Sequence, residues 1–306
     1  MGKVLGIDLG GTRLRIGMVD EAGGMHHHKV VPSSVLKENG DFVGDLIHFL
    51  GEYFEESGEK PEAMAFGIPS AIYKDEKTAF YSPNLKSPQG KVLLDHTNIA
   101  DPVAEAFGVP VWVGKDTNYI LVYDREVMGL QDADVIVAGY IGTGYGGAIM
   151  VNGEFVLGKN GIGEEIGHVP FWHGDALCGC GKRGCAEAYA SGVVLKEIRE
   201  KYFPETDISE MFTKHAKEQV LQEFVYAAAL PFAMMGNLLA PDAYVAGGGV
   251  IEMKDFPRED FKRYIRENIS RAVVENGLDI RFSEVNQEKG VLGSAMYARQ
   301  KLAKLG

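Results

Sequence analysis

The chain has 306 residues, of which 45% are hydrophobic and 24% are charged, a balance typical of a soluble globular protein with one large domain or two medium ones. Its formal net charge of -12 argues against nucleic acid as a partner, because nucleic-acid binders gain affinity by neutralising phosphates with Lys and Arg. The start MGKVLGIDLGG lacks the apolar run of a secretory signal, and no apolar run reaches membrane-spanning length. We therefore expect a cytoplasmic protein with no membrane partner.

Strands and helices alternate along the first part of the chain. The predicted elements, in chain order, are strands at 3–7 and 14–19 around the glycine turn DLGGTR, a helix at 42–54, a strand at 63–68, a helix with Asp101 as N-cap, a strand at 109–114 and a helix from Thr117. Such alternation predicts an α/β sheet rather than a helix bundle or a β-sandwich. His26 to Lys29 (HHHK) could suggest a metal site or a tag remnant, and we interpret it as the polar tip of a hairpin.

The second part of the chain begins a similar cycle. Residues 134–158 predict a strand, a glycine-rich turn, a second strand, a tight turn at Asn152-Gly153 and a short strand. The remaining predicted elements are helices at 187–201 and 217–239, a strand at 243–250, a helix at 259–274, a short strand near Ile280 and a last helix from about Gly290. The weak echo between the two cycles implies two similar halves, and the absence of a low-complexity linker predicts helical hinges between them.

Each half carries a glycine turn between two strands. In DLGGT (Asp8–Thr12) and GTGYGG (Gly142–Gly147), glycine lets backbone N–H groups approach a phosphate with no Cβ in the way, and Thr12 adds a hydroxyl donor. Neither is a Walker A loop or a dinucleotide fingerprint, and either alone could be a simple tight turn. Together with GGG (Gly247–Gly249) after a buried strand, they predict a cleft that grips one nucleotide from both sides.

All three cysteines fall inside eight positions, in CGCGKRGC. In a reducing compartment, clustered thiols hold metal more often than they form disulfides. Zinc takes four tetrahedral N or S ligands, so Cys178, Cys180 and Cys185 leave one vacancy. His168 is the best candidate for it and His173 the runner-up. A zinc site with four protein ligands is closed to water and substrate, so we expect a structural metal.

Asp116 lies just past a predicted strand and before a helix, in VGKDTN. Ligands of α/β proteins usually bind at this end of a strand. A carboxylate there could accept the proton of a substrate hydroxyl while its oxygen attacks a phosphoryl group. The alternative is a plain helix N-cap, a position that Asp also favours.

Taken together, these residues resemble the ROK family of sugar kinases, within the actin-like ATPase fold. The resemblance runs from GIDLGGTRLRIGMVD through GIPSAIY, SPNL, GKDTN, GTGYGGAIMVNGE, NGIGEEIGH and CGCGKRGCAEAYASG to AGGGV, nearly the whole chain. Its most specific part is the ordered pair GEEIGH and CGCGKRGCAE. It implies a duplicated actin-like ATPase (ribonuclease H-like) α/β fold with two domains around a cleft, at 1–117 and 118–289, and a final helix 290–306 that packs back on the first domain.

The resemblance also implies ATP-dependent phosphorylation of a hexose, usually at the hydroxyl on carbon 6, with Mg²⁺ and a structural Zn²⁺ as cofactors and a homodimer as the assembly. The roles that it implies are Asp116 as general base; Asp8 near Mg²⁺ and the phosphates; Gly10, Gly11, Thr12, Gly142, Thr143 and Gly144 at the phosphates; Gly247, Gly248 and Gly249 at the adenosine; Asn84, Glu165, His168 and Glu187 at the sugar; and His168, Cys178, Cys180 and Cys185 at zinc.

The chain departs from the family pattern at two positions. Lys115 precedes Asp116 where sugar kinases of the family commonly carry Asn, and Ser70 follows a proline where glycine is usual. The basic residue before the aspartate, SPNL and GGGVIEMKDFPRED resemble the D-allose kinase branch. Lys115 is therefore expected to face the sugar, the alternative being a plain surface charge, and D-allose is the expected substrate.

Several other functions fit the same resemblance. Glucokinase, N-acetylmannosamine kinase and fructokinase activities belong to the same family. A sugar-sensing repressor would carry a DNA-binding segment ahead of the first glycine turn, where only seven residues precede Asp8, and a non-catalytic sugar-binding relative would be expected to lack Asp116 or a glycine turn. We therefore expect an enzyme whose partners are a sugar and ATP.

Overall fold

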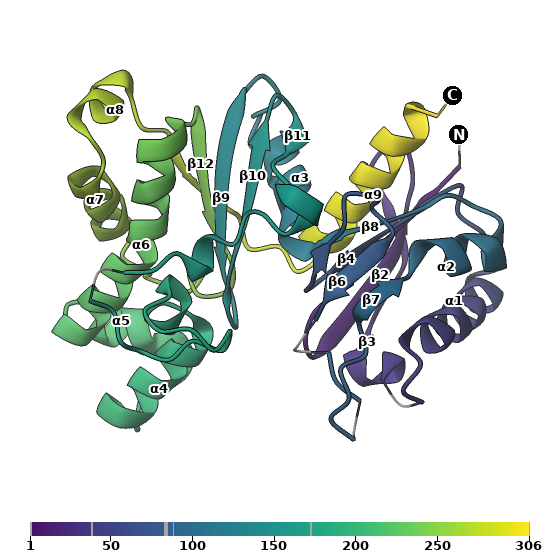
Figure 1. Ribbon diagram of the computed structural model, residues 1–306, viewed down its shortest axis with the longest axis horizontal. Coiled ribbons are helices and arrows are strands. Elements are labelled where there is room, and N and C mark those ends of the chain that lie inside the picture. Colours follow the sequence, from purple (N-terminus) through teal and green to yellow (C-terminus); the bar gives the residue numbers. More distant parts are fainter. Residues whose placement is uncertain (1, 38, 83–84, 88, 172, 306) are drawn as a thin grey trace. The chain divides into compact units, whose positions relative to one another are not determined.

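The structure is a computed structural model that describes residues 2–37, 39–82, 85–87, 89–171 and 173–305. Contacts within the chain divide it into two units (Figure 1). Unit 1 comprises residues 1–129, 157–163 and 286–306, and unit 2 comprises residues 130–156 and 164–285. Unit 1 is thus assembled from three separate pieces of sequence, and each unit has a hydrophobic core of its own.

Unit 1 is built on a five-stranded sheet in the order β3-β2-β1-β4-β8. Its strands are β1 (Val4–Leu9), β2 (Arg13–Val19), β3 (Met25–Pro32), β4 (Met64–Ile68) and β8 (Val111–Lys115). The first three strands pair antiparallel, whereas β4 and β8 run parallel to β1. His26 to Lys29 lie within β3, so the sequence-based prediction of a hairpin tip there is wrong: His26 pairs with Met18 in the ladder instead.

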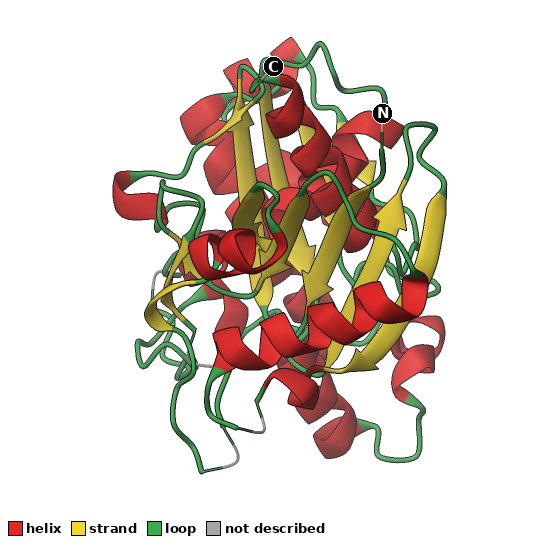
Figure 2. Cartoon of the chain, turned by 90° about the vertical axis from the view of Figure 1, so that its right-hand side faces the viewer, coloured by secondary structure: helices red, strands yellow, loops and turns green. Residues whose placement is uncertain are grey.

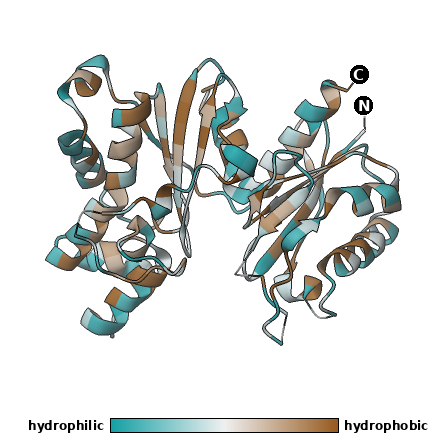
Figure 3. Ribbon diagram, viewed as in Figure 1, coloured by the Kyte–Doolittle hydropathy of each residue, from teal (hydrophilic) through white to brown (hydrophobic). Residues whose placement is uncertain are grey.

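Helices cover both faces of this sheet, as the alternation of its side chains dictates. From β1, Leu5, Ile7 and Leu9 enter one core cluster together with α1 (Phe42–Ser57) and α2 (Ala100–Phe107), whereas Val4 enters a second cluster with α3 (Asp116–Val127) and α9 (Lys289–Ala303). Helix α1 shows the alternating brown and teal of an amphipathic helix in Figure 3. Asp41 caps this helix by accepting the N–H of Gly44.

Two predicted boundaries in unit 1 are corrected by packing. Helix α3 packs on α9 and β4, so the unit extends to Gly129 and not to the predicted limit after Thr117. Helix α2 begins at Ala100, with Asp101 in its first turn and Ile99 at the N-cap position. Helix α9 packs on β1 and α3.

Between β4 and α2 the chain adds a small antiparallel sheet in the order β5-β6-β7. Its strands are β5 (Ala71–Ile72), β6 (Thr78–Tyr81) and β7 (Asp95–Asn98). This sheet is not predicted from the sequence, because each strand is short and shows little alternation of apolar and polar residues. Ser70 helps to fasten it, since its hydroxyl lies 3.0 Å from the carbonyl oxygen of Tyr81 and 3.1 Å from that of Ala71.

Unit 2 repeats the topology of unit 1. Its sheet has the order β11-β10-β9-β12-β13, built from β9 (Val135–Ile141), β10 (Tyr145–Val151), β11 (Glu154–Phe155), β12 (Ala243–Gly247) and β13 (Ile280–Phe282). Again the first three strands pair antiparallel and the last two run parallel to the first. The predicted duplication is confirmed, and the chain has the actin-like ATPase fold, with helices packed on the sheets (Figure 2).

The helices of unit 2 differ from the predicted ones mainly at their ends. They are α4 (Gly192–Tyr202), α5 (Met211–His215), α6 (Gln219–Leu239), α7 (Arg258–Asn268) and α8 (Arg271–Asn276). Residues 186–188 form a separate turn of 3-10 helix, and α4 begins only after Ser191, whose side chain accepts the N–H of Val194. The predicted helix at 259–274 is broken between Asn268 and Arg271, where Ile269 is extended.

Short 3-10 turns connect several of these elements. They are η1 (Ser33–Leu36), η2 (Lys159–Gly161), η3 (Ile166–His168), η4 (Ala186–Ala188) and η5 (Ile208–Glu210). Among the residues that the structure describes, no helix combines the length and the apolar character needed to cross a membrane.

Candidate functional site

The first glycine hairpin, Gly10–Thr12, joins β1 to β2 in unit 1. The N–H of Gly10 donates to the carbonyl of Arg13 over 2.8 Å, which closes the turn. The carbonyl of Gly11 accepts from Ser33 Oγ at 2.8 Å and from Lys37 Nζ at 3.0 Å. A Cβ at Gly11 would meet no atom within 4 Å, so the outer side of this turn has room for a ligand. Sequence reasoning missed Ser33 and Lys37, because nothing in the sequence places the end of β3 beside this turn.

Asp8, at the end of β1, is held on several sides. Its Oδ2 lies 3.3 Å from Nη1 of Arg15, its partner across the β1–β2 ladder. A Cβ on Gly290 of α9 would lie 2.5 Å from Asp8 Cγ, so the carboxylate packs directly against the first turn of that helix. Burial raises the pKa of Asp8 above its ordinary value, opposed by the nearby charges of Arg15 and Lys289. Arg15 also donates to Gln287 Oε1 at 3.1 Å, a contact that the sequence did not predict.

Asp116 is the first residue of α3, directly after β8. Lys115 occupies the N-cap position, and Asp116 Oδ1 accepts the N–H of Thr117 at 2.8 Å. The alternative, in which Asp116 is the N-cap of this helix, is therefore wrong by one residue.

Asp8 and Asp116 share the carboxyl edge of the unit 1 sheet. Asp8 pairs with Gly67 across β1 and β4, and Gly67 pairs with Gly114 across β4 and β8. Because neighbouring strands lie about 4.8 Å apart, the backbones of Asp8 and Gly114 are separated by about 10 Å. That interval can accommodate a phosphoryl group and an attacking hydroxyl.

The second glycine hairpin, Gly142–Gly144, joins β9 to β10 in unit 2. Its turn is closed by the N–H of Gly142, which donates to the carbonyl of Gly144 at 3.0 Å. The GGG stretch lies beside it, because a Cβ on Gly248 would come within 2.6 Å of the Ile141 backbone and the N–H of Val250 donates to Ile141 O. Gly248 has a φ of +89°, which only glycine adopts readily. These two predicted nucleotide contacts thus adjoin each other at one edge of the unit 2 sheet.

The three cysteines and His168 converge, as predicted. Their ligand atoms all lie within 4.8 Å of one another. Cys180 Sγ is 3.7 Å from Cys185 Sγ, and Cys178 Sγ is 3.6 Å from His168 Nδ1. Two sulfurs on one tetrahedral zinc, each at about 2.3 Å, are separated by about 3.8 Å, so the donor set and its spacing fit zinc. His173, the runner-up, is absent from this cluster of described residues.

The protonation of the cluster bears on metal binding. Burial raises the pKa of the Cys178 thiol to about 12. Zinc binds thiolates, so its binding would release protons from this cluster. The affinity for zinc is therefore expected to rise with pH.

His168 and Glu165 follow each other around one 3-10 turn. With Nδ1 toward the thiols, His168 directs Nε2 toward Glu165 Oε2 at 3.8 Å. Gly167 between them packs on the backbone of Tyr145, since a Cβ there would lie 2.0 Å from its carbonyl oxygen. Of these two predicted sugar-side groups, His168 therefore belongs to the cysteine–histidine cluster and Glu165 lies beside it.

Glu187, the third predicted sugar-side group in unit 2, has both oxygens engaged. Its Oε2 accepts the N–H of Tyr145 at 2.8 Å, and its Oε1 lies 3.6 Å from Cys178 Sγ. Asn84, predicted at the sugar, falls outside the described residues.

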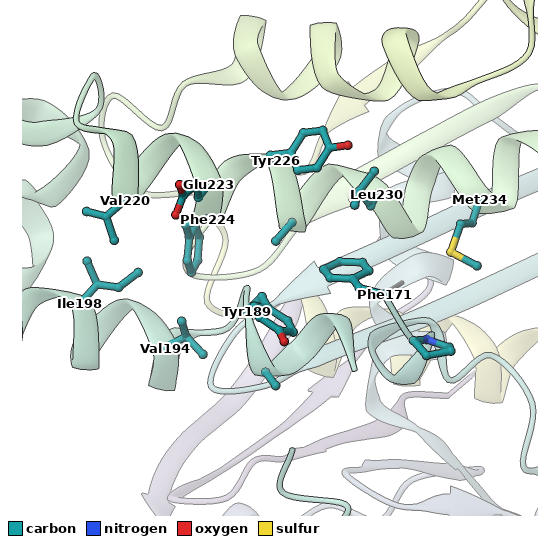
Figure 4. A pocket seen from close by; sticks show the side chains of 13 residues that line it. Phe171, Tyr189, Val194, Ile198, Val220, Glu223, Phe224, Tyr226, Leu230 and Met234 are labelled. Atoms are coloured by element: carbon teal, nitrogen blue, oxygen red, sulfur yellow. The ribbon is translucent and has the colours of Figure 1, made fainter. Parts of the chain in front are cut away.

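An apolar hollow of about 610 Å³ opens beside the loop that follows His168 (Figure 4). Phe171 and Tyr189 face the residues of α6 across it, on the same side as Val194 and Ile198 of α4. Among the described residues of its lining, Glu223 alone is charged. None of the predicted sugar, phosphate or metal residues that the structure describes lines this hollow. Its apolar lining does not suit a hexose or a phosphate.

Comparison with known proteins agrees with this geometry. A family model described as the ROK family matches residues 4–301. A glucokinase of Thermotoga maritima is 26% identical over 322 residues, covering 98% of each chain. An N-acetyl-D-glucosamine kinase of Pectobacterium carotovorum is 29% identical over 264 residues, covering 80% of this chain and 83% of the relative. A ROK family glucokinase from Streptomyces griseus, solved with glucose and AMPPNP, superposes with a TM-score of 0.79 at 25% identity, covering 98% and 100%.

Proposed function

The chain belongs to the ROK family and is an ATP-dependent sugar kinase that acts on hexoses, and from this premise we propose which residues carry the transfer and which sugar it accepts. Asp116 is the proposed general base. The observation that carries this proposal is its place at the carboxyl end of β8, on the same sheet edge as Asp8. A carboxylate there takes the proton of the attacking hydroxyl as that oxygen bonds to the γ-phosphorus and the bond to ADP breaks.

The nucleotide contacts divide between the two glycine hairpins. Phosphoryl transfer depends mainly on positioning and on neutralising charge. We propose that Gly10–Thr12 and Gly142–Gly144 offer backbone N–H groups to the phosphates and that Gly247–Gly249 lie at the adenosine. Asp8 would hold Mg²⁺, which supplies positive charge beside the phosphates.

We propose that Asn84, Lys115, Glu165, His168 and Glu187 contact the sugar, and that His168, Cys178, Cys180 and Cys185 hold a structural zinc ion. Zinc on Nδ1 would fix the ring and tautomer of His168, which leaves Nε2 as a directed partner for a sugar hydroxyl. The donor set supports this assignment, because four protein ligands leave no open position for catalysis at the metal.

D-allose is the proposed substrate, with glucose, N-acetylglucosamine, N-acetylmannosamine and fructose as alternatives. Lys115 supports this proposal, because it changes the hydrogen bonds that the protein can offer to the sugar. The ammonium group of Lys115 can only donate hydrogen bonds, whereas the Asn that is common at this position in the family can both donate and accept them. Glucose and N-acetylglucosamine are the nearest alternatives, because relatives carry the names of kinases for these sugars. We also propose a homodimer in the cytoplasm, where ATP is supplied and thiols stay reduced.

An ATP-coupled assay over these sugars tests the substrate, with Lys115→Asn as the matched variant. Allose and glucose differ only in the configuration at carbon 3, so their ratio isolates one hydroxyl. We expect the wild-type kcat/KM for allose to exceed that for glucose by at least about 10-fold, which is the effect of one hydrogen bond to a charged group. In Lys115→Asn, the ratio of the two kcat/KM values should be smaller. A wild-type preference for glucose or an N-acetylated hexosamine would rule out allose, and turnover of none of the sugars would count against the kinase itself.

A further inference from the structure

The segment from Cys185 to Val193, here called the connecting segment, runs directly from the metal cluster to the second glycine hairpin. It begins at a metal ligand and includes Glu187. Its far end binds the hairpin backbone: the N–H of Gly192 donates to Gly142 O at 2.8 Å, and the N–H of Val193 donates to Thr143 O at 3.3 Å. Two carbonyls of the hairpin are thus held by the start of α4.

Glu187 adds a third attachment from the middle of the same segment. Its Oε2 accepts the N–H of Tyr145, the residue directly after the hairpin, at 2.8 Å. A carboxylate that accepts a backbone N–H forms a charge-assisted hydrogen bond, stronger than a neutral one. The other oxygen, Oε1, lies 3.6 Å from Cys178 Sγ. One side chain therefore touches the hairpin strand and the thiol cluster at once.

The space around Gly144 shows how closely the Glu187 carboxylate packs against the hairpin. A Cβ at Gly144 would lie 2.5 Å from Glu187 Oε2, so any larger residue there would displace the carboxylate. The hairpin and Glu187 pack against each other without a gap. Moving Glu187 would therefore move the hairpin amides that are proposed to face the phosphates.

We propose that Glu187 is a positioning residue for the second glycine hairpin and couples the metal cluster to nucleotide binding. The inference rests on the proposed function, because it takes the second glycine hairpin as the phosphate-binding element proposed above. It adds to the sugar contact already proposed for Glu187. The metal cluster then supports the nucleotide side of the site as well as the sugar side.

Calorimetry of MgADP binding to the sugar-free protein tests the coupling. We expect Glu187→Ala to weaken MgADP binding by at least about 10-fold, the effect of losing a hydrogen bond to a charged group. Glu187→Gln keeps an acceptor oxygen for Tyr145 N–H, so it should restore most of that affinity. Glu197→Ala, a change of an exposed glutamate on α4, is the matched control and should leave the affinity unchanged.

A second arm perturbs the cluster itself. Cys180→Ser removes one ligand at the exposed cysteine, and elemental analysis should show zinc falling from about one atom per chain. MgADP affinity should fall together with the zinc content. Thermal unfolding of each variant identifies any variant that fails to fold.

The outcomes separate the two proposals. If wild-type protein binds MgADP while Glu187→Ala and zinc-depleted Cys180→Ser bind it equally well, the coupling is overturned and the kinase assignment stands. Wild-type protein that binds no MgADP would overturn both. If Glu187 touched only the sugar, sugar affinity would fall in Glu187→Ala with no change in MgADP affinity, which again overturns the coupling.

Discussion

Individual side chains with distinctive chemistry were the easiest to place from the sequence. Cys178, Cys180, Cys185 and His168 converge as predicted, because zinc accepts few kinds of ligand and short loops aim them at one point. Glu187 was predicted for the sugar, and its bond to Tyr145 was not. A carboxylate can serve several partners, and its residue type does not reveal which of them it meets.

At this scale we predict the effect of Asp116→Asn. The amide retains an acceptor for Thr117 N–H but cannot take a proton, so kcat should fall by at least about 10²-fold while the sugar KM changes little. Steady-state kinetics measures both. Asp101→Asn, at an exposed aspartate in the first turn of α2, is the control and should retain full turnover. Equal kcat for Asp116→Asn and wild type would remove Asp116 as the base.

Secondary-structure elements followed their sequence patterns where burial is one-sided. Helix α1 and the strands of both hairpins lie where apolar periodicity predicts them. The sequence pattern did not predict the short strands β5 to β7 or the break between α7 and α8. In these places, contacts with neighbouring elements determine the backbone conformation, and the local sequence pattern does not.

The packing of α9 on β1 and α3 depends on glycine. A Cβ on Gly293 would lie 1.8 Å from Tyr119 O, so Gly293→Ala should destabilise unit 1 by about 2–3 kcal/mol, a typical cost of overpacking. A Cβ on Gly51 of α1 would meet no atom within 4 Å, so Gly51→Ala should instead stabilise by about 0.5–1 kcal/mol. Hydrogen exchange of the β1 amides measures both changes, and a neutral Gly293→Ala would refute this packing.

The whole molecule is two copies of one topology, with unit 1 completed by the end of the chain. Val291, Ala295 and Ala298 of α9 are fully buried. Ser294 Oγ donates to Ile7 O of β1 at 3.0 Å. The core of unit 1 therefore closes only when residues separated by nearly the full length of the chain meet.

Deleting residues 286–306 should consequently leave unit 1 unfolded, while unit 2 keeps its own core. Limited proteolysis with mass spectrometry should show cleavage throughout residues 2–129 and protection within 130–156 and 164–285, the two pieces of unit 2. Deleting only residues 304–306, which follow α9, is the control and should leave both units protected. Equal protection of both units in the longer deletion would contradict the proposed dependence on α9.

The sequence by itself determined the α/β class, the duplicated glycine hairpins, the family and the cluster of three cysteines with His168, because these depend on residue type and short-range spacing. Only the tertiary structure decided that α3 belongs to unit 1, that His26–Lys29 form a strand, and that Arg15 lies at Asp8. It alone placed Glu187 between the thiol cluster and the second hairpin. Such contacts join residues far apart in the chain, and no local pattern encodes which distant backbone group a buried carboxylate will meet.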